Sequence, residues 1–107
     1  MKSAASIEKE TGEHSGRYVA RIDGVQGEAE ISFASLGARI RAEHTHAPET
    51  MRGTGAARAL VEYMVSDARK SGFKIIPVCP YVRAQFEKHP DWQDVVSRES
   101  DDNVSPH

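Results

Sequence analysis

The feature that most constrains the fold of this chain is an amphipathic helix that runs directly into a strand. From Ala56 to Ser71, apolar residues recur at helical spacing and charged residues fill the opposite side. Gly72 stands where a left-handed residue would end the helix, and Arg69 and Lys70 suit the negative end of the helix dipole. The expected apolar stripe consists of Ala57, Leu60, Val61, Met64, Val65 and Ala68.

Strands are expected on both sides of this helix. After Gly37, the apolar residues Ile40 and Ala42 alternate with charged residues in a run that ends near His46. A short apolar strand from Lys74 to Cys79 follows the helix. A strand, a helix and a strand in this order predict a parallel crossover.

Two earlier alternating runs predict an antiparallel hairpin. Tyr18 to Ile22 reads as its first strand, and Asp23-Gly24 marks the turn. In the second strand, Ala29, Ile31 and Phe33 alternate with polar residues, which is typical of a sheet with one solvent-exposed face. The fold class is therefore α/β (α+β), with a mixed, twisted sheet that combines an N-terminal antiparallel hairpin with a parallel strand-helix-strand crossover.

The chain has the length of one domain, which we place at residues 16–96. Residues 1–15 and 97–107 are polar and carry no steady period, so we expect both segments to be flexible. Near the end of the domain, Val82 to Lys88 predicts a short helix that Pro90 ends.

Composition excludes several classes of protein. The formal net charge is -2 and the charges are scattered, whereas a nucleic-acid-binding surface gathers basic residues on one face. No apolar run approaches the length of a membrane span, and the first residues lack the apolar stretch of a signal peptide. The single cysteine, Cys79, cannot form an internal disulfide. We therefore expect a cytoplasmic protein that binds neither nucleic acid nor membrane.

The segment Arg52-Gly53-Thr54-Gly55-Ala56-Ala57 lies between a strand and the start of the patterned helix. Unpaired amides at a helix start, joined by those of a glycine turn, form a concave donor surface that suits a phosphate or pyrophosphate. Glycine is required where a side chain would keep the phosphate away or forbid the backbone angles. Because the flanking elements are so well defined, we favour pyrophosphate binding over the alternative of a plain tight turn.

Two other phosphate-binding motifs were compared with the same residues. A P-loop requires Lys followed by Ser or Thr after its second glycine, but Ala56 and Ala57 stand there, so this motif is excluded. A dinucleotide-binding fingerprint requires a third glycine three residues after Gly55, where this chain has Arg58. The dinucleotide interpretation is therefore weak.

At this turn the chain resembles the GNAT superfamily of N-acetyltransferases, whose motif Arg/Gln-x-x-Gly-x-Gly/Ala is here Arg52-x-x-Gly55-x-Ala57. It is similar in particular to the compact YjdJ-like members, from about Gly16 to Val96. This resemblance implies acetyl-CoA as cosubstrate and transfer of an acetyl group to an amine acceptor, with no assigned metal. The similar motifs are His44-Thr45, Arg52-Gly53-x-Gly55, Ala59-Leu60-Val61, Pro77-x-Cys79-Pro80-Tyr81-Val82 and Phe86-x-x-His89-Pro90.

The resemblance also implies roles for residues outside the turn. The splayed end of the third strand, Thr45 to Ala47, would offer amides to the pantetheine arm and thioester carbonyl of the cosubstrate. Cys79 is a candidate from its own position, because it ends the last predicted strand, precedes Pro80 and lies near the start of a short helix. It could act as a nucleophile or proton carrier, with the alternative that it is a small buried core residue. His46 is a candidate general base, and Tyr81 a candidate acid for the leaving thiolate or else a core residue. His46 and Ala47 depart from the acidic or polar residue and the valine expected there.

Two alternatives to an active N-acetyltransferase remain open. One is a CoA-binding module with little or no activity, which the small number of candidate catalytic side chains favours. The other is a small interaction domain whose hairpin edge pairs with a strand of a partner. The sequence predicts neither the acceptor nor the oligomeric state.

Overall fold

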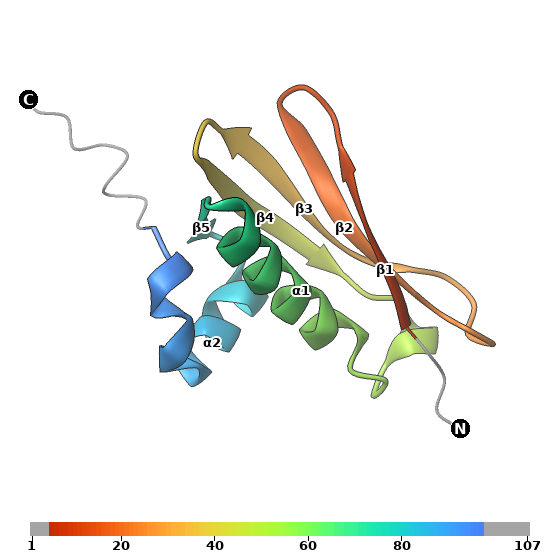
Figure 1. Ribbon diagram of the computed structural model, residues 1–107. Helices are drawn as coiled ribbons and strands as arrows, with labels where there is room; N and C mark the ends of the chain where they lie inside the picture. The colour runs from red at the N-terminus through yellow and green to blue at the C-terminus, as the bar shows by residue number, and fades with distance from the viewer. Residues whose placement is uncertain (1–4, 98–107) are drawn as a thin grey trace, which may run out of the picture.

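The computed structural model describes residues 5–97 of the chain. One sheet carries two α-helices and two 3-10 helices (Figure 1). The elements are β1 (Ala5–Thr11), β2 (Ser15–Ile22), β3 (Ala29–Leu36), β4 (Arg39–His46), η1 (Glu49–Met51), α1 (Ala56–Ser71), β5 (Lys74–Pro77), α2 (Pro80–Lys88) and η2 (Pro90–Val95).

The strands lie side by side in the order β1-β2-β3-β4-β5. The first four pair antiparallel, and β5 pairs parallel with β4. The helix α1 provides the crossover between β4 and β5. The predicted mixed α/β sheet, with its antiparallel hairpin and parallel crossover, is therefore confirmed.

The helix α1 has the predicted bounds, and its glycine end is formed as expected. Gly72 has φ 81°, and its amide donates to the carbonyl of Ala68 at 2.8 Å. The buried stripe differs from the prediction in one residue, since Ala56 is buried and Ala57 only partly so. The stripe begins one residue earlier because the chain enters α1 directly from the glycine turn.

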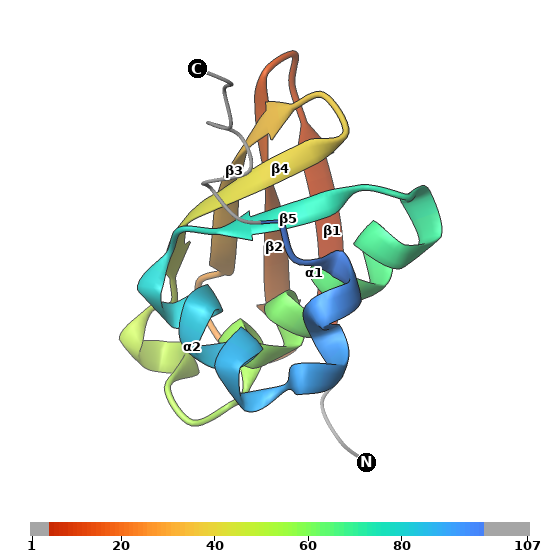
Figure 2. The same cartoon turned by 90° about the vertical axis from the view of Figure 1, so that its left-hand side faces the viewer.

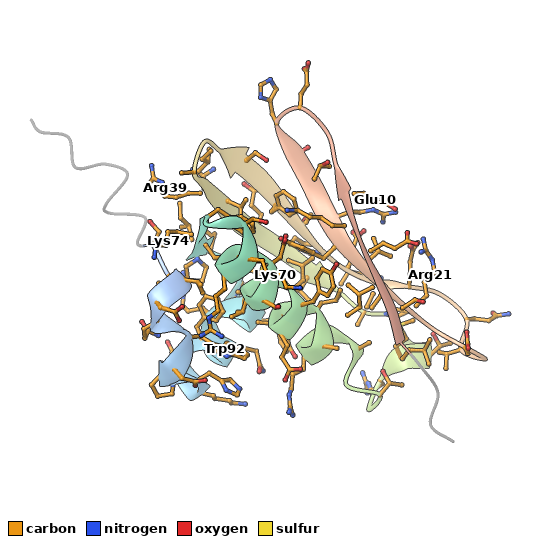
Figure 3. All side chains as sticks on the ribbon, viewed as in Figure 1. Glu10, Arg21, Arg39, Lys70, Lys74 and Trp92 are labelled. Atoms are coloured by element: carbon orange, nitrogen blue, oxygen red, sulfur yellow. The ribbon has the colours of Figure 1, made fainter. Side chains whose placement is uncertain are left out.

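The helices cover one face of the sheet. Inward residues of the strands, such as Ile31 and Ile75, form one core cluster with the buried residues of α1, α2 and η2. Figure 2 shows α2 beside α1 under the sheet, and Trp92 of η2 lies against these helices (Figure 3). The ring of Trp92 meets Phe86 of α2 edge-on, with centroids 5.7 Å apart.

The other face of the sheet carries charged side chains. Arg17 donates to Glu10 at 2.8 Å and to Glu30 at 2.5 Å. Glu10 and Arg21 project away from the helices (Figure 3). Val19 lies between Arg17 and Arg21 on this same face of β2 and is nevertheless fully buried, because long side chains cover apolar neighbours with their stems.

Strand β1 lies within residues 1–15, the segment expected to be flexible, and the sequence analysis did not identify it. Ile7 packs against the core, and the ammonium of Lys9 lies 2.7 Å from a carboxylate oxygen of Asp67 on α1. The same ammonium stands 4.9 Å from the centre of the Phe73 ring. The charged Lys9 occupies an inward position, and so the sequence lacks the apolar alternation that identifies a strand.

Strand β5 ends at Pro77, two residues before the predicted end at Cys79. Proline has no N–H with which to continue a ladder. The amide of Val78 instead donates to the carbonyl of Ile76 at 3.0 Å, and this tight turn ends the regular ladder.

The helix α2 begins at Pro80 rather than at the predicted Val82. Proline fits the first turn of a helix, because the missing N–H would have no intrahelical partner there. In the part of the chain described, no helix is long and apolar enough to cross a membrane. Most of the predicted flexible tail, residues 98–107, lies outside the described residues.

Candidate functional site

The glycine turn joins η1 to α1 in a conformation that only glycine adopts readily. Gly53 has φ 80° and Gly55 has φ 81°, both in the left-handed region. Between them, the hydroxyl of Thr54 donates to the carbonyl of Met51 at 2.6 Å and accepts from the amide of Ala56 at 3.2 Å. Thr54 therefore stabilises the turn itself.

The turn presents several backbone donors. Within residues 5–97, the amides of Gly53, Gly55, Ala57 and Arg58 have no hydrogen-bond acceptor. A Cβ atom added to either glycine would meet no atom within 4 Å. The two glycines are therefore required by their backbone angles, and the surface beside them is open to a ligand.

Arg52 stands at the start of the turn with its side chain 79% exposed. Its guanidinium lies 3.2 Å from the carboxylate of Glu49, three residues earlier in η1. An exposed pair of this kind contributes little to stability and exchanges readily for another anion. The sequence analysis placed Arg52 in the phosphate turn but did not identify the carboxylate that competes for its charge.

The ladder between β4 and β5 is short, because β5 ends at Pro77. They pair from Arg39 with Lys74 to Ala42 with Pro77, and the last four residues of β4 have no β5 partner among the described residues. Glu43 is an extra residue in β4, because Ser32 pairs with His44 and Phe33 pairs with Ala42. A bulge of this kind re-aims the side chains that follow it.

Beyond the bulge, Thr45 faces the core and the histidines face away from it. Thr45 pairs with the buried Ile31, whereas His46 pairs with Glu30 on the charged face. His44 and His46 are both exposed and share that face, as their spacing predicts, and Ala47 is exposed just after the strand.

Cys79 lies at the start of α2, just after the end of β5, where it contacts Thr45 of β4. The sulfur of Cys79 and the hydroxyl oxygen of Thr45 are 3.1 Å apart. The side chain of Cys79 is only 4% exposed and belongs to the core cluster. The structure thus brings Thr45 and Cys79 together, but within residues 5–97 it shows no contact between His46 and either Cys79 or Tyr81.

Tyr81 lies in the first turn of α2 and is half-buried. Burial raises the pKa of its phenol, the guanidinium of Arg58 lowers it, and the carboxylate of Glu62 raises it, with a net increase. These electrostatic partners belong to the first turns of α1. Tyr81 is therefore close to the helix start that carries the glycine turn, and its phenol stays protonated at neutral pH.

Three features of this region were missed by the sequence analysis: the bulge at Glu43, the ion pair of Arg52 with Glu49, and the contact of Thr45 with Cys79. The acidic neighbour three residues before Arg52 was a usable signal for the ion pair. Across residues 5–97, no group of three or more His, Cys, Asp or Glu side chains is arranged to hold a metal ion.

Comparisons with known proteins agree with this architecture. The model of the GCN5-related N-acetyltransferase family matches residues 17–95. A solution NMR structure of a GCN5-like protein from Staphylococcus aureus, described as a candidate N-acetyltransferase, superposes with a TM-score of 0.59 at 26% identity, over 85% of this chain and 88% of that one. No curated protein matches the chain significantly. Since the family model covers most of the chain, this protein belongs to the GCN5-related N-acetyltransferase family.

Proposed function

We propose that the protein binds acetyl-CoA and transfers its acetyl group to an amine. The observation that carries this proposal is the left-handed glycine turn, whose free amides at the start of α1 lie on the crossover between the parallel strands β4 and β5. The turn from Arg52 to Ala57 holds the pyrophosphate through backbone amides. The free end of β4, Thr45 to Ala47, lies along the pantetheine arm and the thioester.

In the simplest reaction, the neutral amine attacks the thioester carbonyl carbon directly. A bond from nitrogen to carbon forms, the carbon–sulfur bond breaks, and the CoA thiolate leaves. His46 accepts the proton of the amine on the charged face of the sheet, where it is exposed. Tyr81, with its pKa raised by burial, donates a proton to the CoA thiolate.

In a second route, the sulfur of Cys79 attacks first and carries the acetyl group to the amine. A Cys79 sulfur–carbon bond forms as the CoA carbon–sulfur bond breaks, and the thiol proton passes to the CoA sulfur. The amine then attacks the acetylated Cys79 and returns a proton to its sulfur. This route requires the cosubstrate to reach a thiol that is 4% exposed.

A CoA-binding module with little activity is the second candidate function. It is favoured by the burial of Cys79 and by the position of His46 on the opposite face of the sheet. We also infer a cytoplasmic location, where a free thiol such as Cys79 stays reduced.

The two functions are separated by measuring binding and turnover on one preparation. Binding at 100 times the dissociation constant stabilises the fold by about 2.7 kcal/mol, which a thermal-unfolding scan with acetyl-CoA detects. Release of CoA thiol is then followed with lysine peptides and polyamines as acceptors. Stabilisation with amine-dependent thiol release is expected; stabilisation without release favours the binding module, and the absence of both refutes acetyl-CoA binding.

A further inference from the structure

We propose that Thr45 is a positioning residue, whose hydroxyl holds the thiol of Cys79 in the orientation in which it meets the thioester. The inference rests on the proposed route of acetyl transfer through Cys79 and gives the Thr45 side chain a role separate from that of its backbone. Its basis is the distance of 3.1 Å between the hydroxyl oxygen and the sulfur.

The bulge in β4 is what makes this contact possible. With regular alternation, position 44 would continue the inward series of Ile40 and Ala42. The extra residue Glu43 shifts that series by one, so that Thr45 pairs with the inward Ile31. Thr45 therefore points toward the start of α2, and the neighbouring His44 and His46 point to the other face.

The backbone of Cys79 is already fixed on both sides of its side chain. Its amide donates to the carbonyl of Ala42 at 2.9 Å, and its carbonyl accepts from the amide of Arg83 at 2.9 Å. The remaining freedom is rotation of the thiol about the Cα–Cβ bond. Threonine is β-branched and has few side-chain rotamers, so Thr45 offers a rigid partner that restricts this rotation.

Among the described residues, the Thr45 hydroxyl and the Cys79 thiol have no competing hydrogen-bond partners. In residues 5–97, the hydroxyl of Thr45 has no other hydrogen-bond partner, and the thiol of Cys79 does not cap α2. A hydroxyl both donates and accepts. Thr45 can therefore accept from the neutral thiol and donate to the sulfur once its proton has passed to CoA. The contact orients the sulfur in both states of the reaction.

Alkylation of Cys79 tests this inference without any cosubstrate. Because the chain has a single cysteine, intact mass after iodoacetamide treatment at neutral pH reports on Cys79 alone. The test compares Thr45→Val, which removes the hydroxyl at nearly constant shape, with Thr45→Ser, which keeps it. Thr50→Val is the matched control, since the Thr50 hydroxyl donates to the carbonyl of Gln26 and lies outside the site.

We expect alkylation to be about threefold to tenfold slower in Thr45→Val, because the thiolate loses a stabilising hydrogen bond and forms less readily. A thiolate without this hydrogen bond is intrinsically more reactive, which offsets part of the decrease in rate. Thr45→Ser and Thr50→Val should match the parent. Equal rates in Thr45→Val and the parent would overturn the inference. A faster rate in Thr45→Val would also overturn it, since that result means that the substitution only loosens the packing around Cys79.

The acetyl-transfer assay on the same variants keeps the two proposals apart. If the protein transfers acetyl through Cys79, Thr45→Val should lower kcat about tenfold with KM for acetyl-CoA within about twofold, and Thr45→Ser should restore kcat. Unchanged kcat in Thr45→Val would overturn the positioning role. If the parent shows no turnover, the proposed function fails, and the alkylation rates still decide whether Thr45 holds the thiol.

Discussion

Replacing Gly55 by alanine separates the binding role of the glycine turn from its structural role, because the same helix supplies a matched control. Gly55 and Gly72 lie at the two ends of α1, and both have φ 81°. At either position an added Cβ atom would meet nothing within 4 Å. Gly55→Ala and Gly72→Ala therefore introduce the same strain into the same helix, and only one of them lies at the proposed pyrophosphate site.

Both substitutions should cost about 1–2 kcal/mol of stability, because alanine is strained in the left-handed region. Each kcal/mol corresponds to a decrease in Tm of about 4–8 °C for a domain of this size. Their effects on binding should differ. The methyl group of Gly55→Ala projects into the open surface beside the amides and displaces the pyrophosphate. Loss of one hydrogen bond to a charged group costs about 1.5–3 kcal/mol, or about tenfold to a hundredfold in Kd.

Calorimetric titration of acetyl-CoA into both variants, well below their Tm, measures this difference. We expect weakened binding by Gly55→Ala and parental affinity in Gly72→Ala. Parental affinity in Gly55→Ala would show that the turn is only a connection between strand and helix. Equal weakening in both variants would show that the loss of binding follows from the loss of stability.

Three further predictions concern other residues. Arg52→Ala should weaken acetyl-CoA binding by up to about fivefold and reduce its salt dependence, as measured by titration at two ionic strengths. If the thiol carries acetyl, acetyl-CoA alone should give a hydroxylamine-labile mass adduct that Cys79→Ser abolishes, whereas full activity in Cys79→Ala would exclude an essential thiol. Burial raises the pKa of the Asp67 carboxyl, but hydrogen bonds from Lys9 and Tyr18 lower it overall. The ionised Asp67 therefore stabilises the fold at neutral pH, and this contribution is lost on acidification below about pH 4. In urea unfolding, the free energy of unfolding of Asp67→Asn should decrease less on acidification than that of the parent.

The sequence predicted the elements whose residues follow a period and whose ends carry glycine or proline. The bounds of α1 were correct because Gly55 and Gly72 mark its ends, and the positive φ values of both glycines confirm the reason for their presence. Strand β1 was missed because Lys9 occupies an inward position, where Asp67, more than fifty residues later in the chain, compensates its charge. The residue pattern of one segment does not indicate which residue of a distant segment it contacts.

The candidate site likewise has one part that the sequence predicts and one part that it does not. The donor turn at Gly53 and Gly55 is a local structure, and its geometry could be predicted from adjacent residues. The proximity of Thr45 to Cys79 depends on the bulge at Glu43 and on the early end of β5 at Pro77. The bulge arises from pairing between strands, whereas the end of β5 follows from Pro77 itself. The contact requires both features, so neither Thr45 nor Cys79 alone indicates it.

The location of the cosubstrate is tested most directly by following backbone amide signals in nitrogen–proton NMR spectra during an acetyl-CoA titration. The account predicts the largest shifts at Gly53 and Gly55, whose amides lie free in the turn, and at Ala47 beyond the end of β4. Gly72, at the far end of α1, should not move. Saturable shifts that leave the turn unaffected, or spectra that do not respond to acetyl-CoA, would contradict the proposed binding site.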